Sequence, residues 1–398
     1  MTQTYPRFPG DTSGPFIREL ARALVRRGDR VTVLTPHAAH VPERWDDDGV
    51  RVRSFRYAPP RWEVIGYSRS LAADERVRRG AALLAPLYAL GAWRAVRGEI
   101  RRCRYDLLQA HWVVPNGLIS SLLAGRLPLA VGVHGSDVFL AERPGVRRLV
   151  AAALRRTSVL TGCSPELVER ICALGFDPAY ARVIPYGVDS EAFSPAPERR
   201  PVWRRRLGIP DDAPMILTVG RMATKKGFQV LIECLPELFE TLPDVHVVLA
   251  GDGDLLAELR AAAAAWPDRV HFTGQVLRDP LPDLYRAADL FVLPAVHDPQ
   301  GNVDGLPNVI LEAMASGLPV VASRLSGIPL AITHGQEGLL VPEQDPAALR
   351  RALERLLADR AAARRMGERG RDRAASKLSW DAVAGHYREA YDLALSAN

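Results

Sequence analysis

The sequence predicts an α/β protein built from two Rossmann-like, doubly wound domains. In both halves of the chain, short apolar runs rich in β-branched residues alternate with amphipathic helical stretches. That alternation is typical of parallel sheets covered by helices. The length of 398 residues, with 47% hydrophobic and 25% charged residues, suits two globular cores better than one.

The first half contains one clear helix and six predicted strands. Phe16–Arg27 has its apolar residues on one face, and Gly28 follows as a stop signal. Only Met1–Thr4 precede the loop Tyr5–Gly14, whereas a doubly wound domain opens with a complete apolar strand. We therefore expect the true start to lie upstream of Met1, with most of the first strand missing. The predicted strands are Arg30–Thr35, Val50–Phe55, Asp106–Ala110, Leu129–Val133, Ser158–Gly162 and Arg182–Pro185.

A domain boundary is predicted near Ser190–Leu207. Phe193–Pro201 holds three prolines without periodicity, which is typical of a linker. Further on, Asp345–Arg373 is predicted to be helical, and Trp380–Leu395 to be a last amphipathic helix. The strands predicted for this half are Met215–Val219, Val245–Ala250, Val270–Thr273, Leu290–Leu293, Pro319–Ala322 and Gly338–Val341. The expected domains are residues 1–190 and 191–376, followed by a C-terminal helix over 377–398.

Composition excludes several classes of protein. The four cysteines have no C-x-x-C spacing, so neither a disulfide framework nor a cysteine zinc site is indicated. The first residues lack the basic and apolar regions of a signal peptide. The longest strongly apolar run, Gly80–Trp93, has 14 residues and contains Pro86, and it is too short for a membrane span. We expect a cytoplasmic protein.

The basic charge is concentrated in the first half. Up to residue 190 there are 28 arginines against 18 acidic residues, whereas the remainder is net negative. Such an excess indicates an anionic partner. The stretch Arg76–Arg104 is either an amphipathic segment lying on the inner face of an anionic membrane or an ordinary domain helix with arginine faces. Nucleic acid is disfavoured because the basic residues are not interleaved with stacking aromatics.

A cationic glycine loop follows the first strand of the second half. Gly220 and Gly227 enclose Arg221, Lys225 and Lys226 just before a helix. A helix N-terminus and paired cations suit a diphosphate. The chain has 49 arginines and three lysines, and two of the three lysines stand in this loop, which indicates a need for compact charge. A solvated basic turn is an equal alternative on this loop alone.

Two carboxylates stand eight residues apart further on. Asp304 lies in a glycine-containing loop, and Glu312 lies on a short helix, Val309–Ser316, that ends at Gly317. A carboxylate accepts two hydroxyl hydrogen bonds at once, which suits the vicinal diols of ribose or a hexose. The alternative is a solvated helix residue and a turn former.

The chain resembles glycosyltransferase family 4, the retaining enzymes with the GT-B fold, in which two Rossmann-like domains face each other across a cleft. The resemblance covers nearly the whole chain, and Asp304–Val321 is its most specific part. It implies an acceptor-side first domain, a nucleotide-sugar-binding second domain and a last helix that crosses back. The matching segments are Pro9–Asp11, Gly14–Ile17, Asp106–His111, His134–Asp137, Val183–Asp189, Phe193, Pro195, Gly220-Arg221, Lys226-Gly227 and Glu312–Val321.

The resemblance also implies roles for single residues in the second domain. Arg221 and Lys226, beside Gly220, would hold the donor diphosphate, and Glu312 would bind the ribose hydroxyls. Asp304 takes the place of a family glutamate that contacts the transferred sugar and is one methylene shorter. The other implied donor contacts are the backbone at Leu306, Pro307 and Asn308, and the base contacts at Gln275 and Val276.

In the first domain, the resemblance places His134 near the donor sugar and the loop Gly10–Gly14 over the phosphates or acceptor. His111 is either a second histidine at the site or a satisfied core imidazole.

Asp252-Gly253-Asp254 in the second domain imitates a metal-binding D-x-D sequence, but we interpret it as a loop near the nucleotide. Asp46–Asp48 is interpreted as a solvated turn.

The function implied is metal-independent, cofactor-free transfer of a hexose, with retention, from a nucleoside-diphosphate sugar to a polysaccharide or lipid-linked acceptor. Positioning and electrostatics would then carry the catalysis. The sequence does not distinguish UDP from GDP, and no protein nucleophile is indicated. Two alternatives stay open: a GT-B epimerase acting on a nucleotide sugar, and a non-catalytic two-lobed sugar-binding protein.

Overall fold

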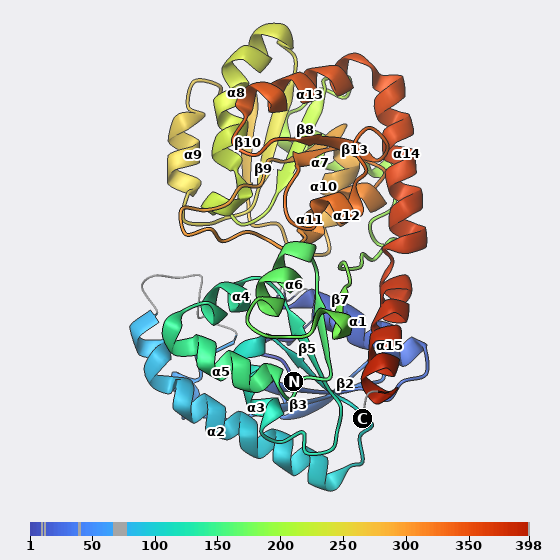
Figure 1. The fold of residues 1–398 in the computed structure, drawn as a ribbon. Helices are drawn as coiled ribbons and strands as arrows, with labels where there is room; N and C mark the ends of the chain where they lie inside the picture. Colours follow the sequence, from blue (N-terminus) through green and yellow to red (C-terminus); the bar gives the residue numbers. More distant parts are fainter. Residues whose placement is uncertain (9–10, 12, 39–40, 67–77, 397–398) are drawn as a thin grey trace. The chain divides into compact units, whose positions relative to one another are not determined.

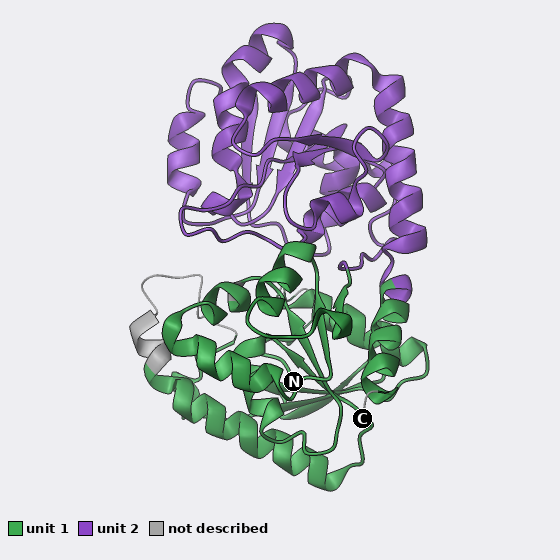
Figure 2. Ribbon diagram, viewed as in Figure 1, with its two compact units in different colours: residues 1–184, 383–398 green, residues 185–382 purple. Residues whose placement is uncertain are grey.

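The computed structural model describes residues 1–8, 11, 13–38, 41–66 and 78–396 (Figure 1). The chain divides into two compact units (Figure 2). Unit 1 comprises residues 1–184 and 383–398, and unit 2 comprises residues 185–382. Each unit is an α/β structure whose strands are mainly parallel and are flanked by helices, as the sequence predicts.

Unit 1 contains two small sheets with the first residues of the chain between them. Thr2 N donates a hydrogen bond to Leu34 O in one sheet, and His111 N of the other sheet donates to Met1 O. The terminal ammonium also donates to Gln109 O at 2.7 Å. Residues 1–2 therefore occupy the place of a central strand. The first sheet has the order β1 (Thr32–Pro36), β3 (Val50–Phe55), β2 (Arg44–Asp47); the second, β4 (Leu108–His111), β5 (Leu129–Val133), β6 (Val159–Gly162), β7 (Ala181–Val183).

The helices of unit 1 cover both faces of the β1–β3 sheet. The apolar stripe of α1 packs on Val33, Val50 and Val52, while Tyr88 and Val96 of α2 pack near Phe55 in a separate cluster. The helices are α1 (Pro15–Arg26), α2 (Arg78–Arg102), α3 (Leu118–Ser121), α4 (Ser136–Ala141), α5 (Pro144–Leu154) and α6 (Pro165–Cys172).

The antiparallel strand β2 is absent from the sequence-based prediction. Asp46 and Asp47 belong to this strand, so the interpretation of Asp46–Asp48 as a turn is wrong for two of its three residues. The turn is formed by Asp48 and Gly49, both at positive φ, as a tight hairpin requires. Asp47 accepts a hydrogen bond from Tyr5 at 2.6 Å. An edge strand of such polar composition lacks the apolar alternation by which strands are predicted.

Unit 2 holds a six-stranded, fully parallel sheet with the order β10-β9-β8-β11-β12-β13. Chain order reverses between β8 and β11, and ligands of doubly wound sheets bind outside the carboxyl ends of strands at such a switch point. Its strands are β8 (Met215–Val219), β9 (His246–Ala250), β10 (Val270–Gly274), β11 (Leu290–Leu293), β12 (Val320–Ser323) and β13 (Gly338–Val341).

The helices of unit 2 flank both faces of its sheet (Figure 1). The stretch Asp345–Arg373, predicted as one helical segment, contains a break: Asp359 ends α13 and caps α14 by accepting from Ala362 N at 2.9 Å. The helices are α7 (Pro201–Leu207), α8 (Phe228–Thr241), α9 (Leu256–Ala262), α10 (Leu281–Ala287), α11 (Asn308–Ala315), α12 (Ile328–Ala331), α13 (Pro346–Ala358) and α14 (Arg360–Lys377).

The last helix, α15 (Trp380–Ser396), joins unit 1 from Val383 onward. Arg388 donates to Arg27 O at 3.0 Å, at the end of α1. In the described part of the chain, no helix is both long enough and apolar enough to cross a bilayer.

Candidate functional site

In unit 2, the predicted site residues surround the switch point of the sheet. The loop Gly220–Gly227 connects β8 to α8, and the segment that carries Asp304 follows β11. Val296 N donates to Lys225 O at 3.0 Å, so the two loops are joined through the backbone. This is the place at which a doubly wound sheet offers its ligand site.

Glycines allow these loops to approach each other. Gly227 has φ 69°, and a Cβ there would lie 1.7 Å from the carbonyl oxygen of Pro294. A Cβ on Gly251, which follows β9, would lie 1.9 Å from Gly220 O. Gly220 N in turn donates to Ala250 O at 2.9 Å. Close backbone packing therefore fixes the course of the loop before α8.

Asp304 forms ion pairs with both lysines of the loop. Lys225 Nζ lies 2.6 Å from one carboxylate oxygen and Lys226 Nζ lies 2.6 Å from the other. Burial alone would raise the pKa of Asp304, but the ammonium groups of Lys226 and Lys225 outweigh it and hold this pKa below its usual range. The cluster is thus ionised and keeps an excess positive charge, which suits an anionic ligand.

Glu312 lies on α11 and is oriented by a buried tyrosine. The hydroxyl of Tyr285, from α10, donates to Glu312 Oε2 at 2.9 Å. Burial raises the pKa of Glu312, while the hydrogen bond from Tyr285 opposes that shift. The sequence offered no signal for Tyr285, because a tyrosine at a buried helix position is ordinarily a packing residue.

Arg221 is less enclosed than the lysines. Its side chain is 46% exposed and lies 3.1 Å from Asp254. Met222 N donates to Asp252 O, so the Asp252-Gly253-Asp254 turn packs against the β8 loop. Leu306 and Pro307 are buried where α11 begins, with Asn308 as its first residue; Gln275 is exposed and Val276 half-buried just beyond β10.

In unit 1, His134 and His111 form a pair at the ends of adjacent strands. His134 Nε2 lies 3.0 Å from His111 Nδ1. Burial lowers the pKa of His134 to about 3 and the pKa of His111 well below its ordinary value. Both imidazoles are therefore neutral near pH 7, and one nitrogen donates to the other. The sequence left the place of His111 open; the structure puts it beside His134.

The surroundings of His134 hold it in place. Asp137 accepts from His134 N at 3.0 Å and from Val113 N at 2.9 Å, so one carboxylate connects two strand ends. The ring of Phe16 lies 5.0 Å from that of His134. Gly14 precedes this phenylalanine by two residues at φ 66°, where a Cβ would lie 2.2 Å from Thr4 Oγ1. Of the predicted loop Gly10–Gly14, residues 10 and 12 lie outside the described residues.

Comparison with known proteins identifies the family. A model described as Glycosyltransferase Family 4 matches residues 14–192, and one described as Glycosyl transferases group 1 matches residues 213–359. The chain belongs to glycosyltransferase family 4. It is 32% identical to a D-inositol 3-phosphate glycosyltransferase of Kineococcus radiotolerans, over 96% of this chain and 91% of that protein.

Further relatives agree with this assignment. A GDP-mannose-dependent alpha-(1-6)-phosphatidylinositol monomannoside mannosyltransferase of Mycobacterium tuberculosis is 32% identical, over 66% of this chain and 69% of that protein. A sucrose-phosphate synthase from Thermosynechococcus elongatus shares the fold with a TM-score of 0.76 at 24% identity, covering 98% of this chain and 94% of that one. The protein is thus a glycosyltransferase of the GT-B class, which confirms the predicted family, fold class and type of enzyme.

Proposed function

We propose that this glycosyltransferase moves a hexose, with retention and without a metal ion, from a nucleoside-diphosphate sugar to a polysaccharide or lipid-linked acceptor. The main support for the proposal is the pair of ion pairs that Lys225 and Lys226 form with Asp304 at the switch point of unit 2. A diphosphate at the start of α8 would meet these ammonium groups and the free N–H groups of the helix end.

Arg221 and Lys226 are proposed to bind the two phosphates and to stabilise the charge that grows on the leaving diphosphate. Preorganised cations of this kind favour the transition state over the ground state, because the leaving group gains negative charge as the bond breaks. Asp304 is proposed to fix the lysines and to contact the transferred sugar. No nucleophile is assigned, so positioning and electrostatics carry the reaction.

Glu312 is proposed to accept hydrogen bonds from the ribose hydroxyls, with Tyr285 setting the direction of its carboxylate. The backbone at Leu306, Pro307 and Asn308 is proposed to line the sugar and phosphates. The base is assigned to the segment that begins with Gln275 and Val276, where both UDP and GDP are candidates.

His134 is proposed to act on the donor sugar as a neutral imidazole. Support comes from its burial, which lowers its pKa to about 3 and keeps it uncharged, and from its contact with His111. A neutral imidazole hydrogen-bonds a sugar hydroxyl without adding a charge that would oppose the departing diphosphate. Gly14 is proposed to let the first loop come close to the substrates.

The enzyme is also proposed to work in the cytoplasm and to contact an anionic membrane peripherally. Leu83, Leu87 and Leu90 are exposed along α2, and the basic charge of the chain is concentrated in its first half. Two relatives are named for inositol-bearing acceptors, so inositol phosphate and phosphatidylinositol mannosides are the first acceptors to test.

The test is a panel of UDP- and GDP-sugars in which release of the nucleoside diphosphate is measured with and without these acceptors. We expect one donor to release its nucleotide only with acceptor, with activity retained in EDTA. Conversion of the donor without acceptor would identify the epimerase, and activity abolished by EDTA and restored by Mn²⁺ would overturn the metal-independent mechanism.

A further inference from the structure

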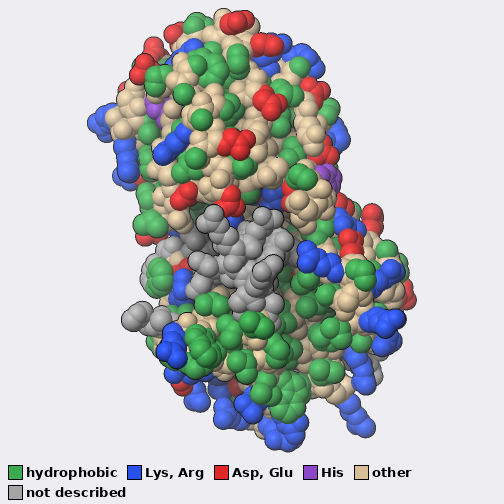
Figure 3. Space-filling view, turned by 90° about the vertical axis from the view of Figure 1, so that its left-hand side faces the viewer, with side chains coloured by type: hydrophobic (Ala, Val, Ile, Leu, Met, Phe, Trp, Pro, Cys, Tyr) green, Lys and Arg blue, Asp and Glu red, His purple; other side chains and the backbone are tan. Residues whose placement is uncertain are grey.

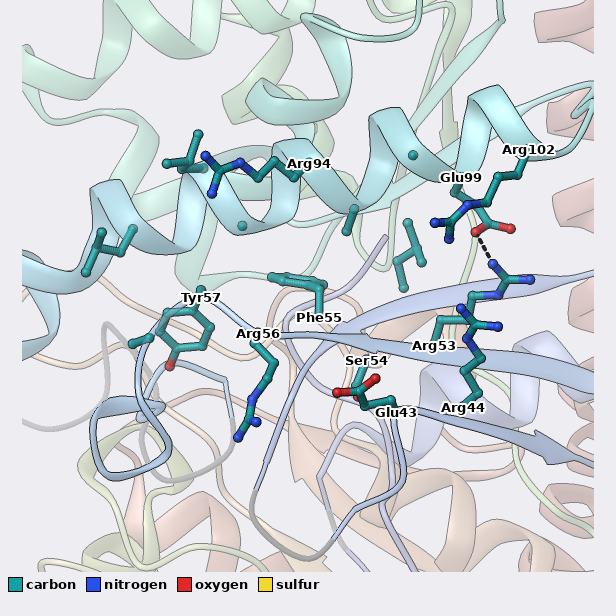
Figure 4. Close-up of a pocket in the computed structure, with 17 residues that line it drawn as sticks. Glu43, Arg44, Arg53, Ser54, Phe55, Arg56, Tyr57, Arg94, Glu99 and Arg102 are labelled. Carbon is teal, nitrogen blue, oxygen red and sulfur yellow. Dashed lines mark hydrogen bonds and ion pairs between the residues drawn. The ribbon is translucent and has the colours of Figure 1, made fainter.

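A second cationic pocket lies in unit 1 and shares no residue with the candidate site. It has a volume of about 500 Å³ and lies between α2 and the strands β2 and β3 (Figure 4). Apolar side chains from α2 and from the end of β3 form part of its lining. The charged residues that line it are Glu43, Arg44, Arg53, Arg56, Arg94, Glu99 and Arg102.

The arginines at one end of this pocket are placed unfavourably for a protein without a ligand. Arg44 on β2 and Arg53 on β3 are direct cross-strand partners. Like charges in that position destabilise a sheet. Figure 4 shows both side chains reaching toward the end of α2, where Glu99 and Arg102 lie. A negative charge close to Arg44 and Arg53 would reduce this repulsion.

Glu99 supplies that charge to Arg53 alone. One of its oxygens accepts from Arg53 at 2.6 Å, and the other accepts from Tyr105 at 2.6 Å. Within the described ranges, no carboxylate lies at ion-pair distance from Arg44 or Arg102. Arg44 and Arg102 are exposed residues that line the same pocket, and their guanidinium groups match the geometry of phosphate oxygens.

The other part of the pocket is apolar and opens onto an exposed ridge of α2. Leu87 and Leu90 line the pocket and are 42% and 43% exposed, and Leu83, one turn earlier, is 81% exposed. Figure 3 shows Lys and Arg side chains among hydrophobic ones on the lower part of the molecule, which is unit 1. A ligand that fits both parts carries a phosphate and an apolar tail.

We propose that this pocket binds the headgroup phosphate of an anionic membrane lipid, with Arg44 and Arg102 on the phosphate and the leucines of α2 against the acyl region. The proposal extends the peripheral membrane contact proposed above by giving it a saturable site. Lipid binding at this pocket does not depend on any step of sugar transfer, so it can be tested independently of the donor site. A lipid that satisfied Arg44 would also relieve its repulsion with Arg53.

The experiment is calorimetric titration of the full chain with a short-chain phosphatidylglycerol below its micelle concentration. We expect saturable one-to-one binding that Arg44→Gln and Arg102→Gln each weaken about tenfold, the scale of losing one charge-assisted phosphate contact. Arg147→Gln/Arg148→Gln is the matched control, because it removes exposed charge from α5 of the same unit. This control should bind as the wild type does.

The melting temperature and donor-dependent nucleotide release are measured on the same variants. Arg44→Gln should melt no lower than the wild type, because it removes a like-charge pair, so lost binding cannot be ascribed to unfolding. Equal weakening in the control would show diffuse attraction and overturn the site. Inorganic phosphate binding as tightly as the lipid, or no saturable binding by the wild type, would overturn it as well.

Discussion

At the residue scale, the lysine cluster of unit 2 carries a net charge, whereas the histidine pair of unit 1 does not. In unit 2, Lys225 and Lys226 share one carboxylate, Asp304, so the cluster keeps a positive excess until an anion arrives. In unit 1, burial keeps His111 and His134 uncharged. The cations thus stand where the proposal puts the growing negative charge, and the neutral groups where it puts the sugar.

Lys226→Ala tests the cationic end. Removal of one preorganised charge partner typically lowers turnover by about 10²–10³-fold, and we expect that loss in nucleoside diphosphate release. Lys377→Ala is the control, since Lys377 is an exposed lysine at the end of α14. Turnover of Lys226→Ala close to that of the control would remove the lysine from the mechanism.

The histidine pair predicts the sign of a pH effect. The folded pKa of His134 is about 3, whereas an unfolded histidine titrates near pH 6.5. The unfolded state therefore binds more protons between these values, and stability falls as pH drops below about 6.5. Urea unfolding of the wild type and of His134→Gln, followed from pH 8 to pH 4, should show a shallower fall in the variant. An NMR titration of His134 near pH 6.5 in the folded protein would contradict this.

The sequence motifs single out candidate site residues, whereas they do not indicate which side chains contact these residues. The cationic loop and the two carboxylates were assigned from helix-end chemistry and family resemblance. No local sequence pattern indicates Tyr285, whose hydroxyl donates a hydrogen bond to Glu312 from a different helix. The same holds for the contact of His111 with His134, which depends on the pairing of β4 with β5. Side chains brought together by strand order carry no signal in their own neighbourhood.

At the element scale, the strands of unit 2 were predicted almost to the residue because all but β10 are short, mainly apolar runs between turns. The polar strand β2 and the break at Asp359 were not predicted, because no apolar pattern marks them. Asp359 acts through a single cap, and one aspartate within an arginine- and alanine-rich stretch does not interrupt helical periodicity.

The loop before α8 can be tested with two glycines of matching conformation. Gly227 and Gly208 both have φ 69°. A Cβ at Gly227 would clash with Pro294 O, whereas a Cβ at Gly208 would meet no atom within 4 Å. Gly208→Ala should cost about 1–2 kcal/mol of unfolding free energy, the usual penalty of the left-handed region. Gly227→Ala should cost clearly more and also weaken binding of nucleoside diphosphate, measured by urea unfolding and calorimetry. Equal costs would show that the close approach to Pro294 is unimportant.

At the scale of the whole molecule, the chain forms two cores and passes between them twice, after Ile184 and within α15, whose residues from Val383 onward belong to unit 1. The proposed donor residues other than His134 and Gly14 all lie in unit 2. Since the two units share no sheet, we expect calorimetry to resolve separate contributions to unfolding, and a ligand held by unit 2 to stabilise that contribution above all.

A nucleoside diphosphate at about 100 times its Kd should stabilise the unit that binds it by about 2.7 kcal/mol. Hydrogen exchange can assign the effect, because protection should increase over residues 220–227 and 304–312 and stay unchanged along α2. Lys226→Ala should abolish the protection, whereas Arg147→Gln should keep it. Stabilisation by free sugar and not by the nucleotide would contradict a nucleoside-diphosphate site in unit 2. Protection confined to unit 1 would move the donor site away from the cationic loop, because a ligand protects the backbone that it touches.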